Sequence, residues 1–445
     1  MIIKNRKQVQ EQYRLSTAGR EGEATRQLSA PQRATSRYLV TMYVGIGDAV
    51  TVGLAAIDQL LQHDPAACGQ IDVLCNTMQA ELFAHDPRVG RIFEASRLLF
   101  PPPEITAWLK DLLPRRAAAH LIQQLHDQHY TAVVSGMFAP GLYARLHAPV
   151  IAPRPLDLWQ DWRALHHLQD RPMSKIVRRA VSRYFGAPLS FDALSETIPL
   201  YLPSPLLQRA QAAVRCMYER AGIAPQDGKL LLVATDTASD VTRPPVALLV
   251  QALTTALARH QRWLVCILPA YTCPASAHEL YQQLAAQYAQ RVLLLAAEPR
   301  ATLLETTALI DQAEMFVTGD TGVMHLAATE KRLGSDDTGG SAPRNATRII
   351  ALFGGTNPAL YGYSRRSIIV GRGRKEQRAY RPGIAKESYR VHGHDLFDHI
   401  APEDITQVLE GADCPDRGHS DDDVCHRYRD PPLPVLGHLH MDTIL

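Results

Sequence analysis

The sequence predicts an α/β protein with two successive domains, each built on a doubly wound parallel sheet. The chain has 445 residues, about three times the usual length of one domain. Short apolar runs alternate with helical patterns, as is typical of parallel strands with helices on both faces. This alternation breaks near Pro199–Pro205 and then begins again, which divides the chain into two units.

The first unit is expected at 38–204 as a Rossmann-like domain. Its short apolar runs predict buried strands at 38–44, 71–75 and 131–135. The turn Gly45-Ile-Gly-Asp48 follows the first of these strands and leads into an apolar helix that continues through Leu61.

The second unit is expected at 227–411, and its apolar runs predict strands at 230–234, 263–268, 291–295, 315–318 and 349–353. Residues 206–221 have the pattern of one helix, and Gly222 is suited to end it. We therefore interpret 205–226 as a connecting helix and linker. The Gly- and Ser-rich stretch 334–345 is typical of an exposed loop.

The two ends of the chain have a different composition from the units between them. Residues 1–37 hold eight Lys and Arg against three Glu, which indicates a flexible basic arm. Residues 412–445 hold seven Asp against three Arg and several Pro, which indicates a disordered acidic tail.

Composition excludes several classes of protein. Hydrophobic residues make up 46% of the chain and charged residues 21%, an ordinary globular balance. The net charge of +2 gives no global attraction to nucleic acid. The seven cysteines form no Cys-x-x-Cys pair and are interpreted as reduced thiols. No apolar stretch approaches a membrane span and the start lacks a signal-peptide core, so we expect a cytoplasmic protein.

The sharpest motif is Thr318-Gly-Asp-Thr-Gly-Val-Met-His-Leu-Ala-Ala328, at the end of a predicted strand. Asp320 is expected to cap the following helix, and Gly322 would let a phosphate approach the free N–H groups of its first turn. His325 lies one turn along the same face as Thr321. An ordinary capped helix with a packed histidine is the competing interpretation.

Two weaker motifs follow other predicted strands. Gly45-Ile-Gly-Asp48 resembles the opening of a dinucleotide fingerprint, but Val50 stands in the place of the third glycine. It sets the Asp48 carboxylate at the mouth of the first sheet, where a helix cap is the alternative role. Phe353-Gly-Gly-Thr-Asn-Pro358 runs from a strand into a small-residue loop, and Thr356 there contacts ligand or belongs to a tight turn.

These three motifs, in this order, resemble the family-9 glycosyltransferases, the ADP-heptose:lipopolysaccharide heptosyltransferases. The resemblance spans roughly residues 38 to 411 and implies a GT-B fold, in which two facing Rossmann-like domains hold the active site in the cleft between them. It implies sugar transfer with inversion and without a bound metal. Asp48 would be the general base, and Asp320, Thr321 and Gly322 would hold the donor, a nucleotide diphosphate sugar such as ADP-heptose.

The chain departs from the family in the loop after the first strand of the second domain. A threonine pair and a lysine are usual there, but this chain has Thr242 at the position of the lysine. Arg243 next to it could supply the cation, since a guanidinium suits a diphosphate. The expected donor-binding residues are therefore Asp320, Thr321 and Gly322, together with Thr237, Arg243, His325 and Thr356.

Residues 171–183 carry five Lys and Arg and no acidic residue. Lys175, Arg178 and Arg179 are therefore expected to contact an anionic glycan or glycolipid acceptor, or the inner face of the membrane. A solvated charged face packed on the domain is the equal alternative. For the whole chain, a sugar-nucleotide epimerase and a catalytically degenerate sugar-nucleotide-binding protein remain the rival functions.

Overall fold

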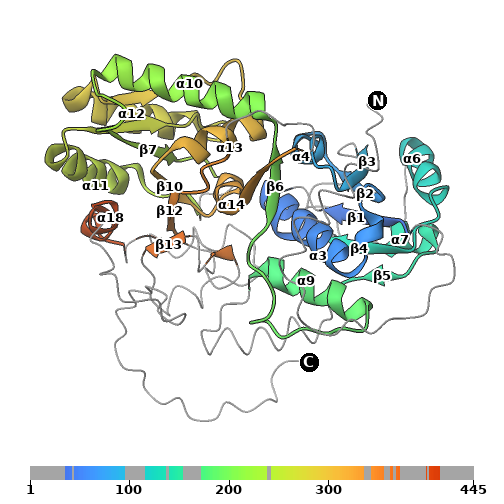
Figure 1. The fold of residues 1–445 in the computed structure, drawn as a ribbon. Coiled ribbons are helices and arrows are strands. Elements are labelled where there is room, and N and C mark those ends of the chain that lie inside the picture. Colours follow the sequence, from blue (N-terminus) through green and yellow to red (C-terminus); the bar gives the residue numbers. More distant parts are fainter. Residues whose placement is uncertain are drawn as a thin grey trace, which may run out of the picture.

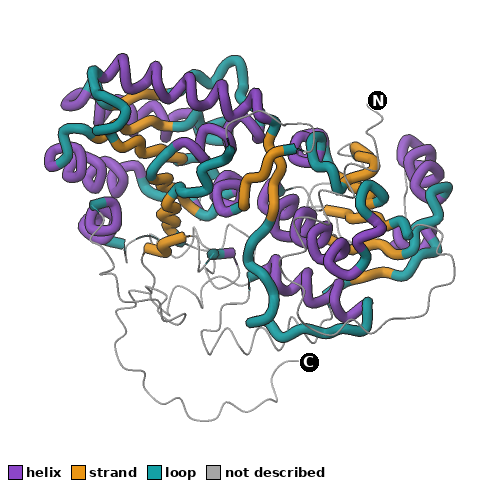
Figure 2. The backbone as a smooth tube through the Cα atoms, in the orientation of Figure 1, coloured by secondary structure: helices purple, strands orange, loops and turns teal. Residues whose placement is uncertain are grey.

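The computed structural model describes residues 36–42, 45–95, 116–136, 140–153, 172–237, 242–334, 342–354, 361–363, 367–370, 397 and 400–410. Figure 2 draws the other residues in grey. Nearly all of the expected basic arm and the whole of the expected acidic tail lie outside the described residues.

The first domain holds a 5-stranded parallel sheet in the order β3-β2-β1-β4-β5. Its strands are β1 (Tyr38–Met42), β2 (Ile71–Cys75), β3 (Val89–Glu94), β4 (Ala132–Gly136) and β5 (Val150–Ile151). β1 and β2 are buried along their whole length, as strands covered on both faces must be. The prediction missed β3 and β5, because β3 is half exposed and β5 has only 2 residues.

Helices follow the strands of this sheet in sequence (Figure 1). They are α2 (Ile46–Asp48), the π-helical stretch η2 (Ala49–Leu54), α3 (Ala55–His63), the short η3 (Pro65–Ala67), α4 (Thr77–Phe83), α6 (Arg116–His126), α7 (Pro140–Leu146) and α9 (Met173–Tyr184). The expected apolar helix through Leu61 is therefore three consecutive helical segments, of which the last, α3, packs against α9.

The second domain holds a 6-stranded parallel sheet in the order β13-β12-β10-β7-β8-β9. Its strands are β7 (Lys229–Ala234), β8 (Trp263–Ile267), β9 (Val292–Leu294), β10 (Met315–Gly319), β12 (Arg348–Leu352) and β13 (Ser367–Val370). In both sheets the strand order reverses beside the first strand, at the β1/β4 and β7/β10 boundaries. A sheet of this kind binds ligands outside the carboxyl ends of its strands at such a switch point.

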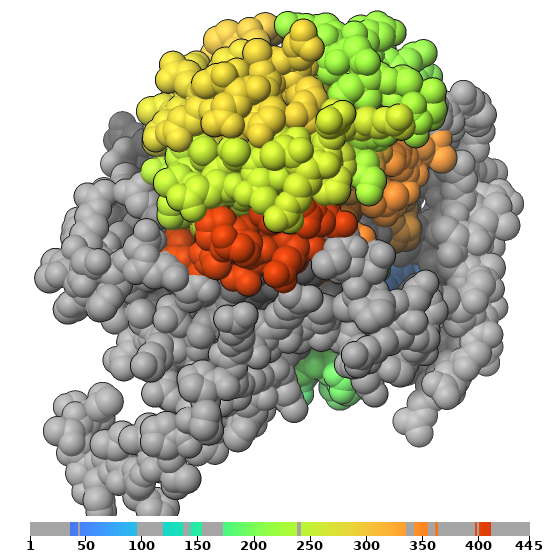
Figure 3. Space-filling model, turned by 90° about the vertical axis from the view of Figure 1, so that its left-hand side faces the viewer, coloured from blue at the N-terminus to red at the C-terminus, as the bar shows by residue number. Residues whose placement is uncertain are grey.

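The helices of the second domain are α10 (Ser204–Ala221), α11 (Val246–Arg259), α12 (Pro274–Tyr288), α13 (Leu303–Gln312), α14 (Gly322–Ala328) and α18 (Pro402–Leu409). The predicted connecting helix is α10, which ends at Gly222 in the left-handed conformation with φ of 64°. Figure 3 shows α18 lying against α11, where the Thr406 hydroxyl donates to the Ala252 carbonyl at 3.3 Å.

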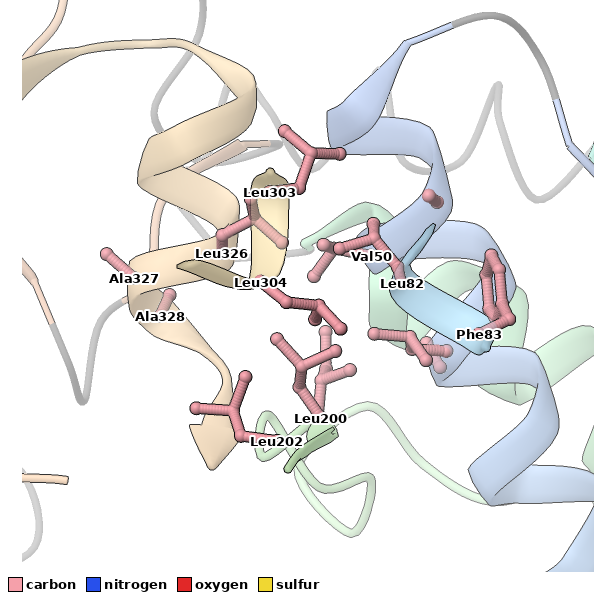
Figure 4. Close-up of a cluster of buried hydrophobic side chains, with 14 of the residues drawn as sticks. Val50, Leu82, Phe83, Leu200, Leu202, Leu303, Leu304, Leu326, Ala327 and Ala328 are labelled. Carbon is pink, nitrogen blue, oxygen red and sulfur yellow. The ribbon is translucent and has the colours of Figure 1, made fainter. Parts of the chain in front are cut away.

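A third, 2-stranded sheet joins the domains, and no local pattern predicted it. β6 (Pro199–Leu202) lies where the predicted alternation breaks, and it pairs in parallel with β11 (Glu330–Leu333) of the second domain. Around this pair, apolar side chains of both domains form one continuous core (Figure 4). The first domain contributes Val50 and Leu82, for example, and the second contributes Leu304 and Leu326.

Candidate functional site

The two switch points face each other in the structure. α2 follows β1 in the first domain, α14 follows β10 in the second, and the two helices are in contact. The expected catalytic residue Asp48 and the expected donor motif at 320–325 therefore come together, although they are far apart in the sequence. Each motif is held in place by the end of a buried parallel strand.

Asp48 is the last residue of α2, and its carboxylate reaches back to the start of that helix. The Gly45 backbone N–H donates to Asp48 Oδ2 at 3.2 Å. Asp48 also precedes η2, but its side chain makes no cap hydrogen bond there; its carboxylate instead satisfies one N–H at the start of α2. Burial raises the pKa of Asp48, while the Gly45 hydrogen bond and the nearby His325 lower it. Burial is the largest of these effects, so Asp48 is a stronger base than an exposed aspartate.

Two glycines allow α2 and α14 to approach each other closely. A Cβ atom on Gly47 would lie 2.7 Å from His325 Cδ2, and one on Gly322 would lie 2.6 Å from Ile46 Cβ. Any side chain at either position would push the two helices apart, because real Cβ contacts are longer than 3.0 Å. The glycine of the donor motif therefore serves a contact between the domains, a role that its sequence context did not indicate.

His325 lies at the centre of this contact and is 5% exposed. Its Nδ1 is 2.8 Å from the hydroxyl of Tyr363, and its Nε2 is 3.5 Å from Asp320 Oδ1. The expectation that Asp320 caps α14 is wrong. Thr321 is the residue at the cap position, with no side-chain cap hydrogen bond, and the Asp320 carboxylate is turned toward His325 instead.

The loop after β7 lies beside the donor motif. Arg243 Nη2 donates to the Thr237 carbonyl at 3.3 Å, and the Thr237 side chain is buried. The Thr242 carbonyl and the Pro244 ring pack over Gly319, directly before Asp320. The structure thus brings Thr237 and Arg243 to the same sheet edge as Asp320, Thr321 and Gly322. Thr356, the last expected donor contact, lies outside the described residues.

The three cations expected to face an acceptor or membrane all lie on α9, and two of them are buried. Lys175 pairs with Glu196 at 3.0 Å, and Arg178, fully buried, pairs with Asp58 at 2.6 Å. Charged side chains are buried in this way only when they are paired. The expectation that Lys175 and Arg178 contact an acceptor or membrane is therefore wrong, and the packed alternative holds for them.

Arg179, the third of these cations, is half-buried, and its guanidinium lies 4.7 Å from the ring centre of Phe191. Its contact with an acceptor stays a prediction. Across the described ranges, no helix is both long and apolar enough to cross a membrane.

The described residues include no group of three or more His, Cys, Asp or Glu side chains placed to hold a metal ion. The cysteines in the described part of the chain are free thiols, and Cys68, Cys75 and Cys266 are buried. Burial raises the pKa of the Cys68 thiol to about 11, which keeps it protonated and unreactive at neutral pH.

Sequence reasoning missed two residues of this site, Ile46 and Tyr363. Ile46 is the variable position of the Gly-x-Gly turn, yet its side chain is the one that meets Gly322. Tyr363 lies beyond β12 in a stretch that carried no motif, and only the fold brings it to His325. The Leu-Tyr-Gly-Tyr run at 360–363 after a motif strand was the one available signal.

Comparisons with known proteins support the resemblance drawn from the motifs. Residues 250–384 match the model of glycosyltransferase family 9 (heptosyltransferase). No curated protein matches the chain.

Among solved structures, the chain is similar to E. coli ADP-heptose lps heptosyltransferase II, with a TM-score of 0.54 and 15% identity over 84% of this chain and 98% of that one. It is also similar to a family-9 glycosyltransferase from Veillonella parvula, with a TM-score of 0.54 and 13% identity over 86% and 98% of the two chains. A third similar structure is E. coli heptosyltransferase WaaC with ADP-2-deoxy-2-fluoro heptose, with a TM-score of 0.53 and 16% identity over 84% and 99%. These likenesses confirm the expected GT-B fold.

Proposed function

We propose that this chain is an inverting glycosyltransferase of family 9, because residues 250–384 match the model of that family and the fold is GT-B. The proposed donor is a nucleotide diphosphate sugar such as ADP-heptose, and the proposed acceptor is a glycan or glycolipid. The observation that carries the proposal is the meeting of Asp48 with the Asp320–His325 motif across the two switch points.

In the proposed reaction, Asp48 is the general base. It takes the proton of the acceptor hydroxyl while that oxygen forms a bond to the anomeric carbon of the donor. The bond from that carbon to the diphosphate oxygen breaks, and the nucleoside diphosphate leaves with the electron pair. Attack from the face opposite the leaving group inverts the anomeric centre. The raised pKa of Asp48 favours this role, because a base whose pKa is closer to the working pH accepts a proton more readily.

The second domain would bind the donor and stabilise the leaving diphosphate. α14 has only 7 residues, so we assign this electrostatic task mainly to Arg243 and to the backbone N–H groups of Thr321 and Gly322. Arg243 is held beside the motif by its bond to the Thr237 carbonyl. A guanidinium can take the place of the usual lysine because its planar fork fits two phosphate oxygens. Transfer would then need no metal ion.

The boundaries expected from the sequence fit this division of labour, and we propose them as the functional units. Residues 38–204 would carry the acceptor and the base, 205–226 would connect the domains, and 227–411 would carry the donor. Because Lys175 and Arg178 are buried, the basic residues of α9 no longer argue for a membrane-bound acceptor. The proposal therefore leaves the acceptor as a glycan or glycolipid that enters from the Asp48 side.

The test is to incubate the purified chain with a panel of ADP-, UDP- and GDP-sugars and a panel of glycan and glycolipid acceptors. Release of nucleoside diphosphate with a glycosylated product of inverted anomeric configuration is expected. Conversion of the donor to its epimer would identify the rival epimerase, and binding without turnover would identify a degenerate binding protein. Activity should persist with a chelator in excess. The matched control is Asp48→Asn. This variant should bind the donor but release almost no nucleoside diphosphate from it.

A further inference from the structure

Tyr363 and His325 form a buried pair at the edge of the proposed active site. The tyrosine is 3% exposed and the histidine 5%. The Tyr363 hydroxyl lies 2.8 Å from Nδ1 of His325, and the two rings meet edge to face with centres 5.6 Å apart. The ring of His325 therefore cannot turn over without breaking both a hydrogen bond and a packed contact.

The other edge of the imidazole faces acidic groups. Nε2 lies 3.5 Å from Asp320 Oδ1, and the backbone of Gly47 covers Cδ2 and Nε2. Asp48, on the same short helix as Gly47, is close enough for His325 to lower its pKa. In the part of the chain that the structure describes, the charged groups that act on the pair include Asp320 from the second domain, Asp48 from the first, and Glu196, which acts on Tyr363.

These neighbours decide which ring nitrogen carries the proton. The Asp320 carboxylate can only accept a hydrogen bond, so Nε2 must be protonated to interact favourably with it. In a neutral ring this leaves a lone pair on Nδ1, which needs a donor. Burial and the charges of Asp320 and Glu196 raise the pKa of Tyr363, so its hydroxyl keeps its proton and can donate. The geometry therefore favours the Nε2–H tautomer.

We infer that Tyr363 is a positioning residue that fixes His325 in its Nε2–H tautomer between the carboxylates of Asp320 and Asp48. Its hydroxyl orients the ring from behind and touches neither substrate nor reacting atom. The Nε2–H group of His325 then holds the Asp320 carboxylate in the orientation in which it would contact the donor. The same N–H group also lies near the proposed base, Asp48, of the first domain. The assignment of the His325 tautomer does not depend on which reaction the protein catalyses. The expected effect of Tyr363 on turnover rests on the proposed function.

The first test reads the tautomer directly. Nitrogen-15 NMR of the full chain labelled at histidine distinguishes a protonated Nε2 from a protonated Nδ1, and His325→Gln assigns the signal. Protonated Nε2 is expected in the parent. In Tyr363→Phe, which keeps the ring and removes only the hydroxyl, we expect a mixture of tautomers. Tyr130→Phe is the matched control, because it removes another buried hydroxyl, 3.0 Å from Asp72 and remote from the site.

The second test reads turnover. Tyr363→Phe should lower kcat about tenfold, equivalent to ~1.4 kcal/mol, and change the KM for the donor less than threefold. Tyr130→Phe should leave both parameters unchanged. If Tyr363 acts through His325, then Tyr363→Phe should have no further effect in the His325→Gln background.

Some results would overturn the inference. An unchanged tautomer in Tyr363→Phe would do so. Additive kinetic effects of Tyr363→Phe and His325→Gln would also do so. A parent without transferase activity would instead refute the proposed function, and the NMR measurement would still decide the role of Tyr363.

Discussion

Gly322 packs directly against Ile46, so that the proposed donor motif of the second domain touches the turn of the first domain that carries the proposed base, Asp48. A Cβ atom on Gly322 would lie 2.6 Å from Ile46 Cβ and 3.0 Å from its Cγ2. Gly47 makes the reciprocal contact with His325. Neither glycine is needed for a left-handed backbone, since neither has a positive φ. Both are needed because a second chain segment lies where a side chain would be.

Replacement of Gly322 by valine should therefore disturb the interface as well as the donor. We expect nucleotide binding to weaken at least tenfold, about 1.4 kcal/mol, and the melting temperature to fall. Isothermal calorimetry and thermal unfolding measure the two effects. Gly322→Ala should be milder, and Ile46→Gly combined with it should restore much of the lost stability, because it removes the atoms that collide. If the double variant is no more stable than Gly322→Ala, the contact with Ile46 is not what limits this position.

Replacement of Asp48 by asparagine should abolish most turnover. Asparagine keeps the size and can still accept the Gly45 hydrogen bond, but it cannot take a proton. We expect kcat to fall by roughly 10²–10⁴, the usual contribution of a general base, while donor affinity stays within a factor of about two. Steady-state kinetics with calorimetry test both. Transfer within about threefold of the parent would leave Asp48 only its structural role.

The same substitution should change the dependence of stability on pH. The pKa of Asp48 is raised in the folded protein, so the folded state holds its proton more tightly than the unfolded state does. The ionised group therefore destabilises the fold above its folded pKa; this cost declines as the pH falls below that pKa and is gone below the unfolded pKa of about 3.9. Asp48→Asn should raise the melting temperature at neutral pH, and the difference should vanish in acid. A difference that grew in acid would contradict the raised pKa.

Arg178 should act in stability and not in acceptor binding. Arg178→Ala leaves Asp58 with the longer ion pair to Arg88, at 3.6 Å, and the Gln62 hydrogen bond, and it removes the donor to the Thr197 carbonyl. We expect the free energy of unfolding to fall by about 3–5 kcal/mol, as when a buried ion pair loses one partner. Denaturant unfolding measures this. Arg209→Ala is the control, because its pair with Glu305 is exposed and should contribute at most about 1 kcal/mol.

Glu81 should contribute to the attachment of the two domains. Its Oε2 accepts the Leu303 backbone N–H at 2.8 Å, so a carboxylate of the first domain satisfies the first N–H of α13 in the second. Glu81→Ala should lower the free energy of unfolding by about 0.5–2 kcal/mol, as the loss of a helix cap does. Glu81→Gln, which can still accept this bond, should lose less. Equal losses in the two variants would mean that the hydrogen bond adds nothing.

The strands of both sheets were largely predictable because parallel strands are buried on both faces and appear as continuous apolar runs. Predicted strands such as 71–75 and 263–268 coincide with β2 and β8 to within one residue. The exceptions are instructive. β3 is partly exposed and carries a weaker signal, and β6 exists only because β11, distant in the sequence, pairs with it. No local pattern can report a pairing of that kind.

The sequence by itself determined the two-domain α/β class, the motifs at the strand ends and their resemblance to family 9, because these features depend on local periodicity and spacing. The tertiary structure alone decided which of those residues share a site. It placed His325 beside Asp320 and Tyr363 and near Asp48, and it paired Lys175 with Glu196 and Arg178 with Asp58. The physical reason is that burial, pairing and pKa are set by neighbours in space. A basic stretch has the same composition whether its charges meet water, a lipid surface or an aspartate.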